Sequence, residues 1–118
     1  MKFMLLVYSN ESDWTDQERA DCMEESAQLC HRLEREGKYI AASPLQLVAA
    51  ATSVRVREGK PLVTSGPFAE THEQLGGYFL IEVDGPEEAA AIASEIPGAK
   101  RGTVEVRPLF ELSSLPSA

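Results

Sequence analysis

The densest group of ionisable side chains in the sequence is a short polar segment in which Glu70, His72 and Glu73 fall within four residues. A free imidazole has a pKa of about 6.5, so a histidine beside a carboxylate is suited to proton transfer near neutral pH. This spacing makes His72 a candidate general acid or base, with Glu70 or Glu73 as the carboxylate that orients it. The segment also fits a structural role, because Thr71 followed by Gln74 is a capping-box pattern for one helical turn.

Four further side chains near this segment could bind a polar ligand. Tyr8 and Tyr78 lie on predicted strands, where a hydroxyl can either donate to a ligand or be satisfied within a core. Ser65, before the polar segment, adds a hydroxyl, and Glu73, within it, adds a carboxylate. Binding pockets usually combine apolar walls with a few convergent polar groups. We therefore expect the loop over residues 65–74 to line the site.

The sequence indicates neither a metal site nor a cofactor. Cys22 and Cys30 are eight residues apart in one predicted helix, which separates them by ~12 Å along its axis and prevents a disulfide. As zinc ligands they form no CxxC pair, and the chain has only two histidines. The pair Gly76-Gly77 is not followed by the lysine and hydroxyl residue of a phosphate-binding loop.

The elements that would position these groups can be predicted from hydrophobic periodicity and capping signals. Thr15 and Glu18 form a capping box that begins a helix, and this helix runs to about Glu36. A second helix begins at Pro86 and ends before Pro97. The predicted strands cover residues 2–8, 38–42, 52–57, 62–64, 78–83 and 103–108, and residues 109–118 form a tail.

The first helix is predicted to bury one stripe of side chains against the sheet. These residues recur at steps of three and four, as an inward helical face requires: Ala20, Met23, Ala27 and Cys30, with Leu33 beside them. Trp14 precedes the helix cap and is expected to pack the helix entry onto the sheet, and His31 falls at the border of the stripe.

The order of the elements predicts an α+β domain of the ferredoxin-like, or split βαβ, type with an extra β-hairpin. Its two central strands should be residues 2–8 and 78–83, and these are the segments with apolar residues on both faces. Two helices can cover only one face of such a sheet. We therefore expect a homodimer in which a second copy covers the other face.

Size and charge narrow the class of protein. The chain has 118 residues, which fits one domain over residues 1–109, and a net charge of −8, which argues against a nucleic-acid binder. The longest apolar run near the N-terminus, residues 3–7, is too short for a signal peptide or a membrane span. A cytoplasmic location without membrane partners is expected.

The segment Ser65-Gly66-Pro67-Phe68-Ala69-Glu70-Thr71 with its continuation to Gly76-Gly77-Tyr78 resembles the DGPF motif of the YCII-related domain family. The first strand at residues 2–8 and the last at 104–108 also look like those of the family. The resemblance implies a dimeric α/β-barrel assembly in a family that is often bacterial and mostly of unknown function. Some family genes lie beside extracytoplasmic-function sigma factors. One distant relative is a dehydrochlorinase for a chlorinated hydroxyquinol, in which a His–Asp pair has been suggested as catalytic.

The chain departs from the family pattern where acid–base chemistry would be expected. The aspartate that names the motif is Ser65, and Asn10 replaces an acidic residue after the first strand. Ser26 stands where some relatives carry a histidine on the first helix. We therefore expect a homodimeric, regulatory small-molecule-binding module. The alternative is a small cofactor-free enzyme, of lyase, isomerase or dehydrochlorinase type, that performs acid–base chemistry in a pocket lined by residues 65–74.

Overall fold

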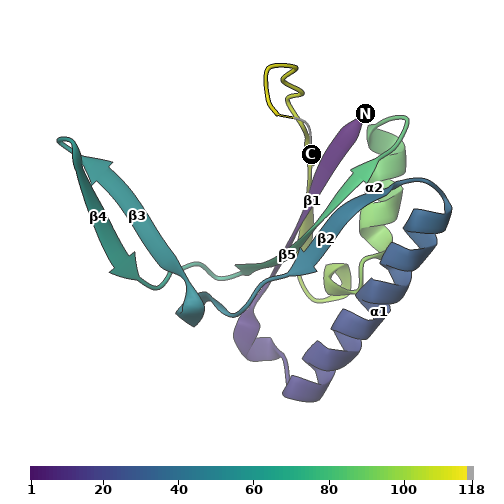
Figure 1. Cartoon of the computed structure of the whole chain (residues 1–118). Helices are drawn as coiled ribbons and strands as arrows, with labels where there is room; N and C mark the ends of the chain where they lie inside the picture. Colours follow the sequence, from purple (N-terminus) through teal and green to yellow (C-terminus); the bar gives the residue numbers. More distant parts are fainter. Residues whose placement is uncertain (117–118) are drawn as a thin grey trace.

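The computed structural model describes residues 1–116 and contains a four-stranded antiparallel sheet, two helices and a separate hairpin (Figure 1). The sheet has the order β2-β5-β1-β6. Its strands are β1 (Lys2–Ser9), β2 (Tyr39–Pro44), β5 (Gln74–Glu82) and β6 (Thr103–Pro108). The helices are α1 (Asp16–Arg35) and α2 (Pro86–Glu95), and the hairpin is β3 (Thr52–Arg57) with β4 (Lys60–Ser65). This α+β arrangement is compatible with the predicted ferredoxin-like fold.

Strand β5 begins four residues earlier than the sequence predicts. Gln74 and Leu75 already pair with Ser9 and Tyr8, and a β-bulge at Gly76 of β5, opposite Val7 and Tyr8, shifts the register there. The pair Gly76-Gly77 therefore lies inside the strand instead of releasing the chain into it. This extension brings the first residue of β5, Gln74, beside the short helix η1 (Glu11–Asp13) that precedes α1.

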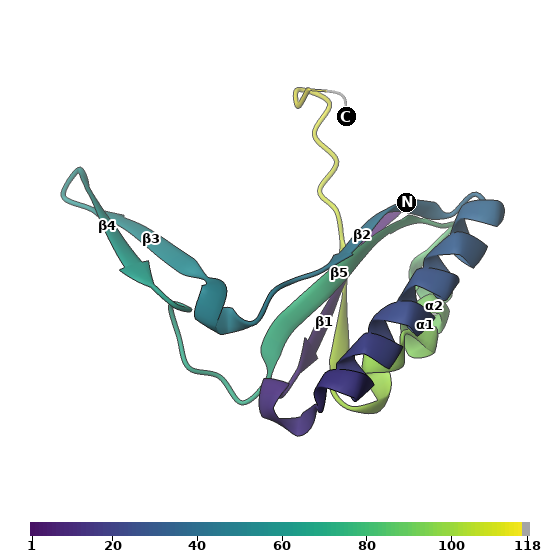
Figure 2. The same ribbon diagram turned by 60° about the horizontal axis from the view of Figure 1, so that its bottom comes forward.

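The core lies between the helices and one face of the sheet. Phe3 and Leu5 of β1 and Ile81 of β5 are fully buried there, together with Leu33 of α1 and Ile96 after α2. Both helices cover this same face, as Figure 2 shows. No helix within residues 1–116 is long and apolar enough to span a membrane.

The predicted buried stripe of α1 is correct only in the second half of the helix. The predicted capping box at Thr15 and Glu18 is present, and Leu29 and Leu33 are buried. Ala20, Met23 and Ala27, however, remain exposed. Small side chains near the middle of α1, such as Ala27, do not fill the space between helix and sheet, so a cavity separates the two surfaces there.

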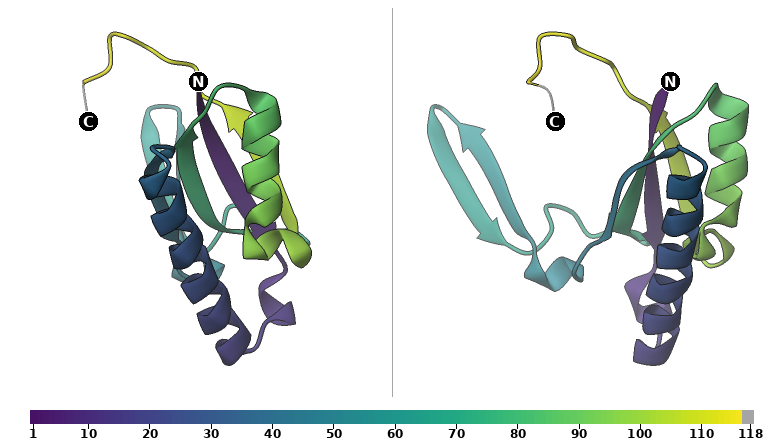
Figure 3. Two further views of the ribbon diagram at one scale, coloured as in Figure 1. Left: turned by 90° about the vertical axis from the view of Figure 1, so that its right-hand side faces the viewer. Right: turned by 45° about the vertical axis from the view of Figure 1, so that its right-hand side comes forward.

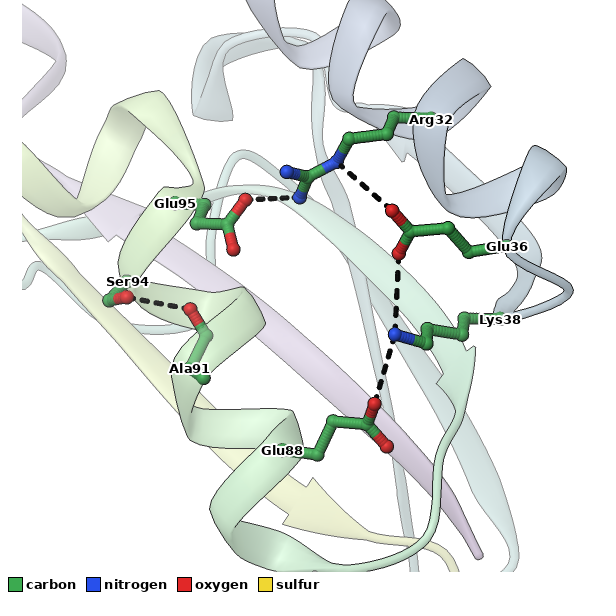
Figure 4. A network of polar contacts seen from close by, with 7 residues as sticks. All are labelled: Arg32, Glu36, Lys38, Glu88, Ala91, Ser94 and Glu95. Atoms are coloured by element: carbon green, nitrogen blue, oxygen red, sulfur yellow. Dashed lines mark hydrogen bonds and ion pairs between the residues drawn. The ribbon is translucent and has the colours of Figure 1, made fainter.

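Polar contacts join the outer ends of α1 and α2 (Figure 4). Arg32 of α1 pairs with Glu95 of α2, and Lys38 lies 3.3 Å from Glu36 and 2.9 Å from Glu88. The hydrogen bonds that Lys38 donates to Glu88 and Glu36 raise the pKa of Lys38, and the bond from Lys38 lowers the pKa of Glu88. These pairs hold the C-terminal half of α1 against α2, while the N-terminal half has no such neighbour along α2.

The β3–β4 hairpin, residues 52–65, projects from the body and is called the arm below (Figure 1). The sequence Glu58-Gly59-Lys60 predicts a hairpin turn here, and positive φ at both Glu58 and Gly59 confirms it. The alternation of residues 52–57 predicts a half-exposed strand, but Val54 and Val56 are 61% and 60% exposed. The radius of gyration is 16.0 Å, against about 13.5 Å for a compact chain of this length. The arm accounts for this extended shape.

The face of the sheet opposite the helices is uncovered within residues 1–116 and is called the open face. In β1 the side chains of Met4, Leu6 and Tyr8 alternate with the buried residues and occupy this face, and Leu80 of β5 pairs with Met4. These four residues are half-buried. The centre of the open face is therefore apolar, as the sequence predicted for both central strands.

Candidate functional site

A cavity of about 430 Å³ lies between the sheet and α1, where its lining runs from Arg19 to Glu34. Its walls come from α1, β1, β2, β5 and the segment that follows β2. Small residues create the space: Ser26 and Ala27 on the helix face Ala42 and Gly77 on the sheet. Met23, Leu45, Leu47 and Phe79 make the lining largely apolar. This volume falls within the usual range of small-molecule pockets.

One end of the cavity is built on Glu11, which follows β1. Its backbone N–H donates to Gln74 Oε1 over 2.9 Å, and its carboxylate Oε2 accepts from the Val48 N–H over 3.0 Å. Arg19 of α1 donates to the Glu11 carbonyl over 3.3 Å. Glu11 thus fixes three segments to one another, and Glu11, Gln74 and Arg19 all line the cavity. The polar groups at this end are held in place before any ligand binds.

A second fixed point lies at the start of α1. Trp14 lines the cavity and donates from Nε1 to Ser9 Oγ over 3.1 Å, while the Arg101 guanidinium lies 4.6 Å from the centre of its ring. Arg101 also pairs with Glu18. The hydrogen bond from Arg101, with that from the Thr15 backbone, lowers the pKa of Glu18 to about 2. These contacts attach the first turn of α1 to the chain after α2 and hold the cavity open at its N-terminal end.

Both thiols border the cavity. Cys22 and Cys30 are free, as the sequence predicted, but they are half-buried at the cavity and not core residues, and burial raises the pKa of each thiol. They are therefore protonated at neutral pH and serve as weakly polar wall. His31 and Glu34 stand three residues apart on α1 and also line the cavity. Among residues 1–116 no three histidine, cysteine or acidic side chains are grouped to hold a metal ion.

The candidate catalytic residues lie on the exposed loop between the arm and β5. Glu70 and His72 are both exposed, and neither lines the cavity. Glu73 is half-buried and accepts a hydrogen bond at Oε1 from the Thr103 hydroxyl over 3.0 Å. Thr71 and Gln74 form no helical turn: the Thr71 hydroxyl donates to the Glu73 carbonyl, and Gln74 Nε2 donates to the Thr71 carbonyl. Gln74 is the residue of this loop that reaches the cavity.

The remaining ligand-binding candidates are spread over three places. Tyr78 contributes to the cavity lining. Tyr8 lies on the open face, paired with Thr103 of β6. Ser65 ends β4, at the base of the arm. Both Tyr78 and Gln74 are lining residues, but Tyr78 pairs with Leu6, so its side chain is on the open face. Tyr8, Ser65, Glu70, His72 and Glu73 lie outside the lining.

The sequence reasoning missed most of the cavity wall, although a signal was present. The helical spacing predicts Met23, Ala27 and Cys30 as core residues. These side chains are small or flexible, and opposite Gly76-Gly77 they have too little volume to fill a core. Trp14 was expected to pack the helix entry onto the sheet, and it contacts Ser9 at the end of β1. Its position beside a small-residue face could have indicated a pocket.

The comparisons with known proteins concern almost the whole chain. A profile of the YCII-related domain family matches residues 1–113. The chain is 33% identical over 124 residues to an uncharacterized protein of Rhizobium meliloti (strain 1021), and the alignment covers 99% of this chain and 100% of that relative.

Proposed function

This chain belongs to the YCII-related domain family, and we propose that it is a homodimeric module that binds a small molecule between α1 and the sheet. The observation that carries this proposal is the cavity of about 430 Å³ with its apolar wall and its pre-fixed polar end. The Gly66-Pro67-Phe68 segment supports placing the chain in the DGPF subgroup of the family.

The wall of the cavity specifies the class of ligand. Met23, Ala27, Leu47 and Phe79 offer apolar contact, and each buried CH₂ of a ligand gains about 0.8 kcal/mol. The polar groups at the Glu11 end already bond to one another, so a strongly charged ligand would have to break those bonds. We infer a small, largely apolar ligand, such as an aromatic molecule with one hydroxyl or carbonyl.

Homodimerisation through the open face completes this proposal. The apolar centre around Leu6 and Leu80 would be removed from water by the same surface of a second copy, in a two-fold arrangement. Leu6→Lys would bury a charge in that interface, beside Glu105 of β6, and removing such charges from water is costly. We expect it to raise the dimer dissociation constant at least 100-fold in sedimentation equilibrium. Thr103→Lys, on the same face at the edge strand β6, is the control and should change it little.

Ligand binding can be tested on the unmodified chain with benzyl alcohol as a neutral aromatic probe. The sequence has one tryptophan, Trp14, and it lines the cavity, so its emission should change saturably. In ¹H–¹⁵N spectra the amides of residues 22–31 and 76–79 should shift together. Shifts confined to other segments, or a linear response without saturation, would overturn the proposal.

A second candidate function is acid–base catalysis in the same cavity, and the specific observation for it is that His31 and Glu34 both line the wall. In this case His31 would exchange the proton, whereas His72 and Glu70 on the exposed loop would contribute only to a ligand that extends out of the cavity. His31→Ala should then abolish turnover of a bound substrate. Activity that survives His31→Ala but disappears in His72→Ala would place the chemistry in the loop instead.

A further inference from the structure

The arm has two chemically different sides. Because Val54 pairs with Val63, and Val56 with Pro61, these four residues share one side, called the apolar side of the arm. Arg55, Arg57 and Lys60 lie on the opposite side, with Leu62. The apolar side is not covered within residues 1–116: Val54, Val56 and Val63 are each 60–63% exposed. The arm is therefore amphipathic, with a valine surface in contact with water.

An exposed hairpin of this kind needs a partner. Two strands alone are at best marginally stable in water, and a third element is normally required to cover their apolar side. At the base, the Gly66 N–H donates to the Ala51 carbonyl over 2.7 Å, and Ser53 Oγ donates to the Gly66 carbonyl over 2.8 Å. These bonds fix where the arm leaves the body but cover none of its valines.

The arm stands on the same side of the sheet as the open face. Figures 1 and 3 show the helices on one side of the sheet and the arm on the other. The segment after β6 also extends toward that side, and its Phe110 is 85% exposed. Three uncovered apolar surfaces, the arm, the open face and the segment after β6, thus lie on one side of the sheet.

Charge distinguishes a second copy of this chain from other occupants. Residues 52–65 contain three basic side chains and one acidic one, a net charge of +2. Because the whole chain has a net charge of −8, the remaining residues together carry −10. A basic arm is therefore attracted to the acidic body of another copy. It would also offset the repulsion between two bodies of like charge.

We propose that the arm docks on a second copy of this chain, with its apolar side buried against the body of that copy. The proposal rests on the homodimer inferred above and adds a reciprocal contact to it. Each copy contributes one arm, so the two-fold interface contains the open faces and two arms. The basic side of each arm then faces away from that body, and its positive charge attracts the acidic neighbour at longer range.

The test compares two neighbouring positions on β4 in the full chain. Val63 and Thr64 are both exposed but lie on opposite sides of the arm. We expect Val63→Asn to raise the dimer dissociation constant at least tenfold in sedimentation equilibrium and Thr64→Asn to change it less than twofold. Equal effects of the two substitutions would overturn the proposal. An isotope-filtered NOE spectrum of a mixed labelled and unlabelled dimer should also show contacts between protomers from the valine methyls of the arm.

The outcomes separate this proposal from the proposed open-face dimer. If Leu6→Lys dissociates the dimer and Val63→Asn does not, the arm proposal fails and the open-face interface stands. The reverse pattern would support the arm and reject the open face. Wild-type protein that is monomeric at 100 micromolar or above would overturn both. The NOE measurement needs no variant, so a Val63→Asn protein that fails to fold leaves the test intact: arm contacts only within one protomer would refute the docking.

Discussion

Filling the cavity with a larger side chain should increase stability and decrease ligand binding at the same time. Ala27 lines the cavity from α1, and Ala27→Leu adds three carbon atoms there. Complete burial of these atoms would contribute about 2.4 kcal/mol, from about 0.8 kcal/mol for each. Since the Ala27 position is exposed, we expect roughly half of this, about 1 kcal/mol, which corresponds to a rise in Tm of about 3–5 °C for a chain of this size.

The matched control is Ala20→Leu on the same helix. Ala20 is also exposed but does not line the cavity, so this variant measures the effect of helix propensity and of an exposed leucine alone. Thermal unfolding followed by circular dichroism gives both Tm values, and titration with benzyl alcohol gives the affinities. Ala27→Leu should weaken benzyl alcohol binding at least tenfold, and Ala20→Leu should leave it unchanged.

Two results would refute this reasoning. If Ala27→Leu lowers Tm well below that of Ala20→Leu, the leucine is overpacked, and the space between α1 and the sheet is closed in solution. If both variants bind benzyl alcohol with the wild-type affinity, the molecule binds elsewhere. In that case the proposed function would lose the observation on which it depends.

Two further predictions concern the contacts that shape the cavity. Arg101 lowers the pKa of Glu18 from 4.5 to about 2. The ionised Glu18 carboxylate therefore stabilises the folded chain above pH 4.5, and this stabilisation is lost as the pH falls toward 2. Glu18→Gln should therefore reduce Tm at pH 6 and match wild type near pH 2, whereas the control Glu24→Gln should show no such convergence. A Cβ on Gly102 would lie 1.9 Å from the Tyr8 carbonyl oxygen, so Gly102→Ala should destabilise the chain by about 2–3 kcal/mol in urea unfolding. An unchanged unfolding midpoint would contradict the close approach of these segments.

The sequence predicts the architecture well because periodicity and caps are local signals. The capping box at Thr15, the hairpin turn at Glu58-Gly59 and the two-sided apolar strands can all be recognised within a few residues. The α+β class follows from their order alone. Element ends were less accurate: β5 begins early because Gln74 bonds to Glu11, a contact 63 residues away in the chain that no local pattern contains.

The cavity could not be predicted in the same way. Whether a helical stripe packs as core or lines a pocket depends on the volume left between the helix and the sheet. That volume depends on side chains of both surfaces, such as Ala27 of α1 and Gly77 of β5. The loop around His72 is predicted as a site because its ionisable residues are adjacent in sequence. Adjacency in sequence does not bring side chains into a cavity, and the polar groups that line it, such as Arg19 and Glu11, come from segments that appeared ordinary.

The segment that joins β2 to the arm connects the two proposals physically. Leu45 and Leu47 line the cavity, Val48 donates to Glu11 at the cavity end, and the arm begins at Thr52. A ligand that contacts Leu47 and a partner that contacts the arm therefore act on one short stretch of chain. By linkage, a ligand that strengthens dimerisation by a given factor must bind the dimer more tightly than the monomer by that factor. We expect benzyl alcohol to shift the dimer dissociation constant in sedimentation equilibrium. Ala27→Leu should abolish this shift, and an unchanged dissociation constant at saturating probe would show that cavity and arm are independent.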